Sequence, residues 1–164
     1  MTDEPVLIRI GILTISDRCF RRERDDRGGP AIANSLPDGL YEVVRRDVVP
    51  DEAASISATL RDWASACDVI LTTGGTGLSP RDVTPEATLS VLDRQAPGIP
   101  EALRADGLRH TGFAMLSRGV AGTIGRTLVV NLPGSPNGAR EGIAVLLPVL
   151  EHAVRLLRGE QPHS

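Results

Sequence analysis

The residues best suited to chemistry lie together in one short segment, 73–86. Three of the four residues 74–77 are glycine, which excludes regular structure and lets the backbone approach a ligand closely: Gly74, Gly75 and Gly77. A hydroxyl, a cation and a carboxylate follow within the same loop: Ser79, Arg81 and Asp82. The N–H groups of such a loop, next to the positive end of a helix, favour a bound anion. The segment therefore predicts a phosphate site.

A strand and a helix must position this loop. The apolar and β-branched run 69–72 is short enough for a strand buried on both faces of a sheet. After the loop, the residues Thr84, Pro85 and Glu86 fit a hydroxyl N-cap, a first helical position and an early carboxylate. We expect a helix to begin there and to continue to Leu92.

The glycine loop alone does not fix a ligand, because a tight strand-to-helix turn without any ligand has a similar composition. The segment is not the dinucleotide fingerprint G-x-G-x-x-G, and it is not the P-loop, which needs a lysine. The chain contains no lysine, so its 18 basic residues are all arginine. Phosphate would therefore be bound by arginine, backbone N–H groups and a metal ion.

Two further loops follow predicted strands. Residues 6–15 predict a central first strand, and Ser16 and Asp17 follow its carboxyl end, where open α/β sheets place ligands. Residues 127–131 predict another strand, followed by the loop 132–138. The central residues of that loop are Pro133, Gly134 and Ser135. We expect the two glycine-containing loops to form opposite walls of one pocket, although the second also fits a plain turn.

Such a pocket would combine a phosphate site with several carboxylates. Its expected hydroxyls are Ser16, Thr73, Thr76, Ser79 and Ser135, and its expected carboxylates are Asp17, Asp51 and Asp82. Like charges repel, so a divalent cation is needed between carboxylates and phosphate. Mg²⁺ accepts one or two carboxylates together with phosphate oxygens and offsets charge that develops on a reacting phosphoryl group. The residues alone predict a Mg²⁺-dependent nucleotide or phosphate-ester site.

Several charged residues in these loops have two possible roles. Asp51 fits either a helix N-cap or a functional carboxylate, and Asp17 fits either an N-cap or a partner of Arg18. Arg81 is placed either to bind phosphate or to pair with the adjacent Asp82. The arginine-rich segment 18–29 is either a solvated, mobile loop of mixed charge or a flap that binds phosphate. We expect no catalytic or metal-binding role for His110.

Strands and helices alternate along the chain. Beyond the elements above, we expect a strand at 41–49 near a sheet edge and helices at 29–36, 51–64, 98–108 and 138–157, the last kinked or split at Pro148. A short helix is expected at 113–118. The alternation predicts an α/β fold, a three-layer α/β/α arrangement with a mostly parallel central sheet, in a single domain over residues 1–164.

The composition limits the functional class. A length of 164 residues is enough to bury a core without disulfides, and two cysteines without a C-x-x-C pairing exclude a stapled secreted scaffold. Aromatic residues make up 2% of the chain and the net charge is −3, which argues against nucleic acid as a partner. Residues 1–6 lack the features of a signal peptide, and no apolar run is long enough to span a membrane. We expect a cytoplasmic protein.

The string T-G-G-T-G-L-S-P-R-D-V-T-P-E-A at 73–87 resembles the signature of the molybdopterin adenylyltransferase family (MogA/MoaB-like). Three other stretches agree with that family in order and spacing: 15–18, 49–52 and 131–136. The polar turn 117–119 is also similar to the family, whereas 20–24 departs from it, because members often carry smaller residues there. The resemblance covers roughly residues 8–157.

The resemblance implies a reaction in molybdenum cofactor biosynthesis, in which the terminal phosphate of molybdopterin attacks the α-phosphorus of ATP to give adenylyl-molybdopterin and pyrophosphate. Asp51 and Asp82 would then be the catalytic carboxylates and would position Mg²⁺ or the substrate. The residues that hold the nucleotide or the pterin would be Ser16, Asp17, Thr73, Gly74, Gly75, Thr76, Gly77, Ser79, Arg81, Pro133, Gly134 and Ser135. Family members are typically homotrimers that pass their product to a molybdenum-inserting enzyme.

Two other functions compete with this one. The first is a non-catalytic molybdopterin-binding trimer, a short-form paralogue that stores or hands over the pterin. The second is a related enzyme domain that acts on another nucleotide, such as a pyrophosphatase of nicotinamide metabolism. Asp51 and Asp82 argue against a pure binding protein, since two carboxylates beside a phosphate weaken simple binding.

Overall fold

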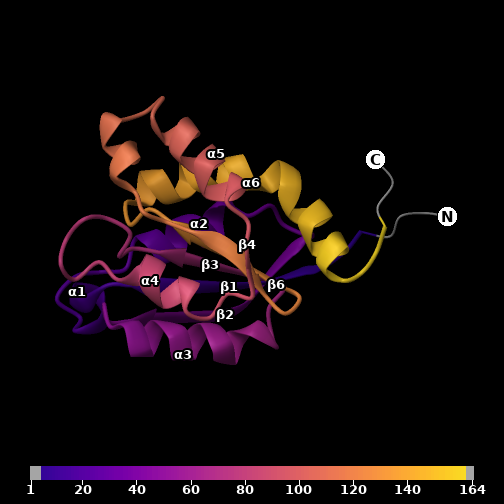
Figure 1. The fold of residues 1–164 in the computed structure, drawn as a ribbon, viewed down its shortest axis with the longest axis horizontal. Helices are drawn as coiled ribbons and strands as arrows, with labels where there is room; N and C mark the ends of the chain where they lie inside the picture. The colour runs from indigo at the N-terminus through magenta and orange to yellow at the C-terminus, as the bar shows by residue number, and fades with distance from the viewer. Residues whose placement is uncertain (1–4, 162–164) are drawn as a thin grey trace.

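The computed structural model describes residues 5–161, in which a single sheet lies between two layers of helices (Figure 1). The strands are β1 (Ile8–Ile15), β2 (Tyr41–Val49), β3 (Val69–Thr73), β4 (Arg94–Gln95), β5 (Ala121–Ile124) and β6 (Thr127–Leu132). The helices are α1 (Asp17–Phe20), α2 (Gly28–Ser35), α3 (Ala53–Ala64), α4 (Thr84–Leu89), α5 (Gly98–Gly107), the 3₁₀ helix η1 (Gly112–Leu116) and α6 (Pro136–Leu157).

The strand order across the sheet is β2-β1-β3-β6-β5-β4. Strands β2, β1, β3 and β6 pair in parallel. Beyond β6, β5 pairs antiparallel with β6, and β4 pairs antiparallel with β5. From β1 the chain moves outward to β2 and then returns across β1 to β3, so the order reverses between β1 and β3. Open α/β sheets bind ligands at the carboxyl ends of the strands at such a reversal. The predicted three-layer fold with a mostly parallel sheet is confirmed.

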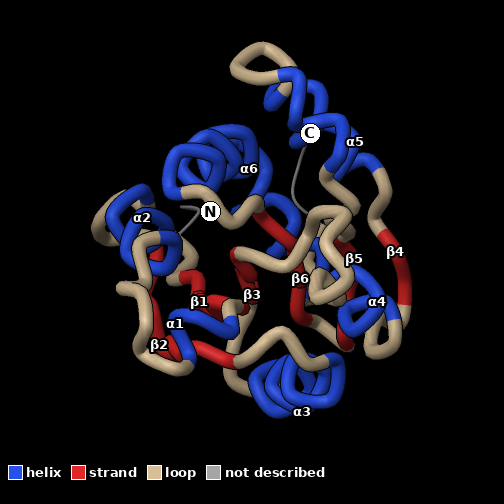
Figure 2. The backbone as a smooth tube through the Cα atoms, turned by 90° about the vertical axis from the view of Figure 1, so that its left-hand side faces the viewer, coloured by secondary structure: helices blue, strands red, loops and turns tan. Residues whose placement is uncertain are grey.

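Two hydrophobic cores hold the layers together. On one face, α2 and α6 cover the sheet (Figure 2). They pack on it through residues such as Ile32, Ile143 and Leu150. On the other face, α3 and α4 pack on it through Trp63 and Ala87. Strand β3 contributes to both cores because all five of its residues are buried. Its continuous apolar pattern is that of a parallel strand covered on both faces.

The sequence missed two short strands. Between α4 and β6 it predicted only helices and turns, but Arg94–Gln95 and Ala121–Ile124 add an antiparallel edge to the sheet. β5 and β6 are joined by a tight turn in which Gly125 has φ +57°. Strands of two and four residues give too short an alternation to stand out in the sequence.

Three local predictions need correction. Thr84 is not the N-cap of α4, which is Val83, and its hydroxyl instead donates to the carbonyl of Gly74 at 2.9 Å. Asp51 is not the N-cap of α3 either, since that position belongs to Glu52. Pro148 does not split α6, which runs without a break through 22 residues. Pro148 lacks only one donor, and the long apolar stripe of the helix keeps both halves on the sheet.

In the described range 5–161, none of the helices is both long enough and apolar enough to cross a bilayer. Residues 1–4, which contributed to the expectation of a cytoplasmic location, lie outside the described residues. The same holds for residues 162–164 at the other end of the predicted domain.

Candidate active site

The loops singled out in the sequence all leave the carboxyl ends of the parallel strands. Because β1, β2, β3 and β6 run in the same direction, their ends lie at one edge of the sheet. Ser16 follows β1, Asp51 follows β2 after one residue, Gly74 follows β3 and Pro133 follows β6. One edge of the sheet thus collects four segments that are far apart in the sequence.

The glycine loop after β3 depends on the absence of side chains. Gly74 and Gly75 have φ of +102° and +69°, which L side chains rarely adopt. A Cβ at Gly74 would also overlap the carbonyl oxygen of Ile15, and one at Gly75 would overlap the hydroxyl of Thr84. The turn leaves the N–H groups of Gly75, Thr76 and Gly77 without a protein acceptor within residues 5–161. These free donors are what an anion needs.

The two predicted walls meet directly. Thr73 donates its hydroxyl to the carbonyl of Pro133 at 2.7 Å, and the N–H of Gly74 donates to the carbonyl of Leu132 at 3.4 Å. A Cβ added to Gly134 would lie 3.3 Å from the Cα of Gly74. The buried Thr73 hydroxyl therefore ties the two loops together.

A cavity of about 560 Å³ opens beside these loops, and it is large enough for a small organic ligand. Of the predicted residues, Thr76, Gly77, Pro133 and Ser135 line it. The N-terminus of α6 also faces it, where the Ser135 side chain caps the helix by accepting from the N–H of Gly138 at 3.0 Å. The cavity therefore combines free amides of the glycine loop with the positive end of a 22-residue helix.

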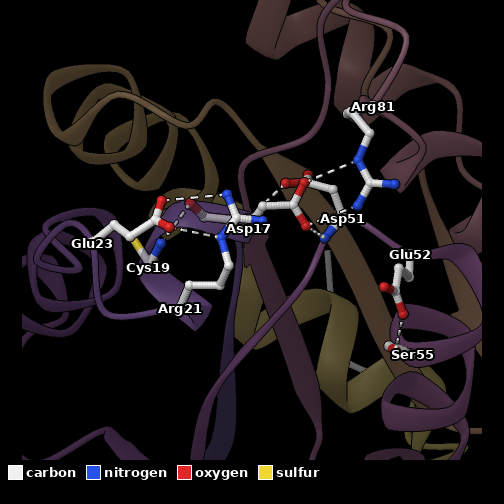
Figure 3. Close-up of polar contacts among 9 residues, drawn as sticks. Asp17, Cys19, Arg21, Glu23, Asp51, Glu52, Ser55 and Arg81 are labelled. Atoms are coloured by element: carbon white, nitrogen blue, oxygen red, sulfur yellow. Dashed lines mark hydrogen bonds and ion pairs between the residues drawn. The ribbon is translucent and has the colours of Figure 1, made fainter.

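The charged residues gather at the other side of the glycine loop. Asp17 accepts two hydrogen bonds from Arg81, at 3.0 Å from Nε and 2.9 Å from Nη2 (Figure 3). The backbone N–H of Asp17 donates to Asp51 Oδ2 at 2.8 Å, and the N–H of Asp51 donates to Asp17 Oδ1 at 3.0 Å. Asp17 is thus paired with Arg81 rather than with Arg18, and Arg81 is paired with Asp17 rather than with Asp82.

The two carboxylates respond differently to this arrangement. The hydrogen bonds from Arg81 lower the pKa of Asp17, although its partial burial opposes them. Burial raises the pKa of Asp51, and the negative charges of Asp17 and Asp82 raise it further. Within the described residues Asp51 accepts a hydrogen bond only through Oδ2, which leaves Oδ1 without a protein donor. A carboxylate whose neighbours disfavour its charge is suited to bind a cation.

Asp82 lies on the glycine loop itself. Its Oδ2 accepts the N–H of Ser79 at 3.0 Å, and a Cβ on Gly77 would lie 2.9 Å from that oxygen. The Asp82 carboxylate therefore folds back toward Gly77. Ser79 itself is exposed, and Ser16 is used as the N-cap of α1, where it accepts from the N–H of Cys19.

The arginine-rich segment after β1 is anchored at one point. Asp26 accepts from the hydroxyl of Thr14 at 2.9 Å and from the N–H of Gly29 at 3.0 Å. The arginine side chains themselves are exposed, and Arg21 pairs with Glu23 at 3.0 Å. Asp26 therefore fixes the backbone of the segment, while the arginine side chains face solvent.

The sequence missed the far wall of the cavity. The segment α5 to η1 contributes Leu103, Asp106, His110 and Phe113, and α6 contributes Glu141. His110 lies between two carboxylates, with Nε2 3.5 Å from Asp106 Oδ2 and Nδ1 3.6 Å from Glu141 Oε1. The sequence predicted a helix at 98–108, but a helical pattern does not indicate which face of the sheet the helix covers.

A comparison with known protein families identifies the family of this chain. Residues 11–152 match the family model described as a probable molybdopterin binding domain. The chain belongs to this family of molybdenum cofactor biosynthesis proteins. The matched range includes the glycine loop, Asp51, Asp82 and the loop after β6.

Relatives of the molybdopterin-binding family are similar over most of the chain. The molybdopterin adenylyltransferase of Helicobacter pylori is 36% identical over 156 residues, which cover 93% of this chain and 89% of that protein. The molybdenum cofactor synthesis protein cinnamon of Drosophila melanogaster is 40% identical over 153 residues, but this chain spans only 26% of its length. The crystal structure of MoaB from Thermus thermophilus is 54% identical, with a TM-score of 0.88 over 94% of this chain and 98% of that chain.

Proposed function

We propose that the chain catalyses the Mg²⁺- and ATP-dependent adenylylation of molybdopterin. The observation that carries this proposal is the placement of free amides at Gly75–Gly77 between a ligand-sized cavity and the carboxylates Asp51 and Asp82. Family membership supports the substrate class, and the adenylyltransferase from Helicobacter pylori supports the reaction.

The reaction needs two phosphate groups close together. A terminal phosphate oxygen of molybdopterin forms a bond to the α-phosphorus of ATP, and the bond from that phosphorus to the β-phosphate oxygen breaks to release pyrophosphate. No protein nucleophile takes part, so the protein contributes positions and charges. The amides of Gly75, Thr76 and Gly77 and the positive end of α6 would hold phosphate oxygens on the cavity side.

The carboxylates fit a Mg²⁺ ion that is shared with phosphates. Within residues 5–161 no group of three or more His, Cys, Asp or Glu side chains is arranged to hold a metal. Mg²⁺ commonly binds one or two carboxylates and completes its shell with water and phosphate oxygens. Asp51 and Asp82 would hold the ion, and its charge would offset the negative charge on the phosphoryl oxygens. The raised pKa of Asp51 agrees with a site whose charge is balanced only when a cation is bound.

The remaining residues would position the substrates. The side chain of Arg81 is more than half exposed and pairs with Asp17, which is hydrogen-bonded to Asp51, so the guanidinium lies beside the carboxylates. We assign it, with Asp17, Ser16 and Ser79, to the outer contacts of the nucleotide or pterin. Pro133, Gly134 and Ser135 would form the opposite wall, and Thr73 and Gly74 would hold the two walls together.

We also propose that the protein works in the cytoplasm as a homotrimer that hands its product to a molybdenum-inserting enzyme. Sedimentation equilibrium should then give a mass three times the chain mass of 17.4 kDa. A monomer mass at micromolar concentration would contradict the proposed trimer but not the proposed reaction.

The test of the function is pyrophosphate release by the purified protein with molybdopterin, ATP and Mg²⁺. Release should require all three components. Asp82→Asn keeps the shape of the side chain but removes its charge, so it should lower turnover by about 10²- to 10³-fold with an unchanged fold. Near-normal turnover by that variant would remove Asp82 from the mechanism. No release, with pterin binding still measured by calorimetry, would favour a non-catalytic binding protein.

A further inference from the structure

Hydrogen bonds within the turn 79–82 fix the shape of that turn, but they do not fix its orientation relative to the rest of the protein. The N–H of Asp82 donates to the carbonyl of Ser79 at 2.9 Å, and the N–H of Ser79 donates to Asp82 Oδ2 at 3.0 Å. Both bonds lie inside the turn. Leu78 and Ser79 are exposed, so packing does not hold the turn against the rest of the protein. Something outside the turn must aim the Asp82 carboxylate at the site.

Arg118 makes that connection from the opposite segment. Its Nε donates to the carbonyl of Gly77 at 2.8 Å, and its Nη2 donates to the carbonyl of Asp82 at 2.8 Å. Its backbone N–H donates to the carbonyl of Thr76 at 2.8 Å, and its Nη1 pairs with Glu86 in α4. One guanidinium therefore holds the loop at both ends and ties it to the helix that follows. The planar fork of arginine donors allows this, and a single ammonium group cannot reproduce it.

Arg118 is itself held in place. Arg104 Nη1 donates to the carbonyl of Gly119 at 3.1 Å and to that of Ser117 at 3.4 Å. Val120, which follows Gly119, donates its N–H to Oδ1 of the buried Asn131 at 3.1 Å. Asn131 belongs to β6, so the segment 117–120 is fixed to the centre of the sheet. The loop with Asp82 is therefore aligned with the same strand that carries the opposite wall.

We propose that Arg118 is a positioning residue for the adenylyl-transfer site and acts through the loop 77–82. It does not touch the reacting atoms. It holds the Gly77 carbonyl and the Asp82 backbone, and thereby sets where the Gly77 amide and the Asp82 carboxylate lie relative to the cavity. This inference rests on the proposed function, in which Asp82 is a catalytic carboxylate.

The experiment compares pyrophosphate release by the wild type with Arg118→Ala, Arg118→Lys and Glu86→Gln. Arg118→Ala should lower kcat at least tenfold and change KM for ATP less, because the loop loses its alignment rather than its binding groups. Arg118→Lys should not restore kcat, since one nitrogen cannot hold both carbonyls. Glu86→Gln removes only the exposed ion pair and leaves the carbonyl contacts, so it should stay within about twofold of the wild type.

Two further measurements separate positioning from general stability. In the Asp82→Asn background, Arg118→Ala should lower kcat by a smaller factor than it does in the wild-type background, because the Asp82 charge that Arg118 aligns is already lost. Hydrogen exchange of the peptide that covers residues 77–82 should be faster in Arg118→Ala and unchanged in Glu86→Gln. This readout needs no substrate, and if the alanine variant does not fold, Arg118→Lys takes its place in both measurements.

The outcomes distinguish the two proposals. A wild type without pyrophosphate release contradicts the proposed function, whatever the exchange data show. An active wild type together with wild-type kcat and exchange in Arg118→Ala overturns the positioning role. Additive losses in the double variant would also overturn it, because Arg118 would then act independently of Asp82.

Discussion

At the scale of single residues, the site places a carboxylate where its charge is disfavoured. Burial and two neighbouring aspartates raise the pKa of Asp51 above its ordinary 3.8. A carboxyl group with a raised pKa contributes fully to stability below its unfolded pKa, and the contribution is lost as pH rises through the folded pKa. The ionised Asp51 therefore destabilises the metal-free protein at neutral pH.

Asp51→Asn should stabilise the metal-free protein and inactivate it. At pH 7 the free energy of unfolding should rise by roughly 1 kcal/mol, a typical size for one substitution, because the unfavourable charge is removed. The gain should disappear below about pH 4, where Asp51 is protonated in both states. Urea unfolding across this pH range checks the sign. Added Mg²⁺ should stabilise the wild type but not the variant, and a variant less stable than the wild type at pH 7 would refute this account.

At the scale of elements, the glycine loop depends on backbone shape. Gly74 has φ +102° and lies against the backbone of β1, which cannot move aside as a flexible side chain would. Its N–H also reaches the carbonyl of Leu132 in β6. Three strands therefore fix the position of this one residue.

Gly74→Ala should cost roughly 2–5 kcal/mol of stability, from an unfavourable φ together with the overlap with Ile15. Gly39→Ala is the matched control, because Gly39 has φ +88° but no atom within 4 Å of an added Cβ. Gly39→Ala should lose only the stability that an L residue costs at a positive φ, about 1–2 kcal/mol. Chemical denaturation of both variants gives the comparison, and equal losses would show that the overlap does not matter.

At the scale of the whole molecule, the two ends of the parallel strands have different roles. The carboxyl ends of the strands carry the site, and the amino ends carry an ion cluster around the buried Asp68. Asp68 accepts from the backbone N–H of Arg9 at 2.8 Å, from Arg9 Nη2 at 3.1 Å and from Arg158 Nη2 at 3.0 Å. It thereby joins β1, the start of β3 and the end of α6.

Asp68→Asn should lower the stability by about 2 kcal/mol, the usual size for lost hydrogen bonds to a charged group. Burial opposes the charge of Asp68, but the hydrogen bonds from Arg9 lower its pKa below 3.8. The stabilisation by ionised Asp68 is therefore present above pH 3.8 and is lost as the pH falls through the folded pKa. The difference in unfolding free energy between Asp68→Asn and the wild type should therefore become smaller in acid. Turnover at 25 °C should stay unchanged, because the substitution is at the opposite edge from the site. A loss of kcat without unfolding would contradict this separation.

The sequence determined the strands β1, β2, β3 and β6 and the loops after them, because continuous apolar runs and clustered glycines act locally. It also determined the family, since the string 73–87 is specific on its own. Only the tertiary structure decided which charges pair. Arg81 joins Asp17 across 64 positions, and Arg118 reaches Gly77 across 41. The cavity wall of α5 and η1 was likewise decided by packing, because helical periodicity gives a buried face but not the surface that buries it.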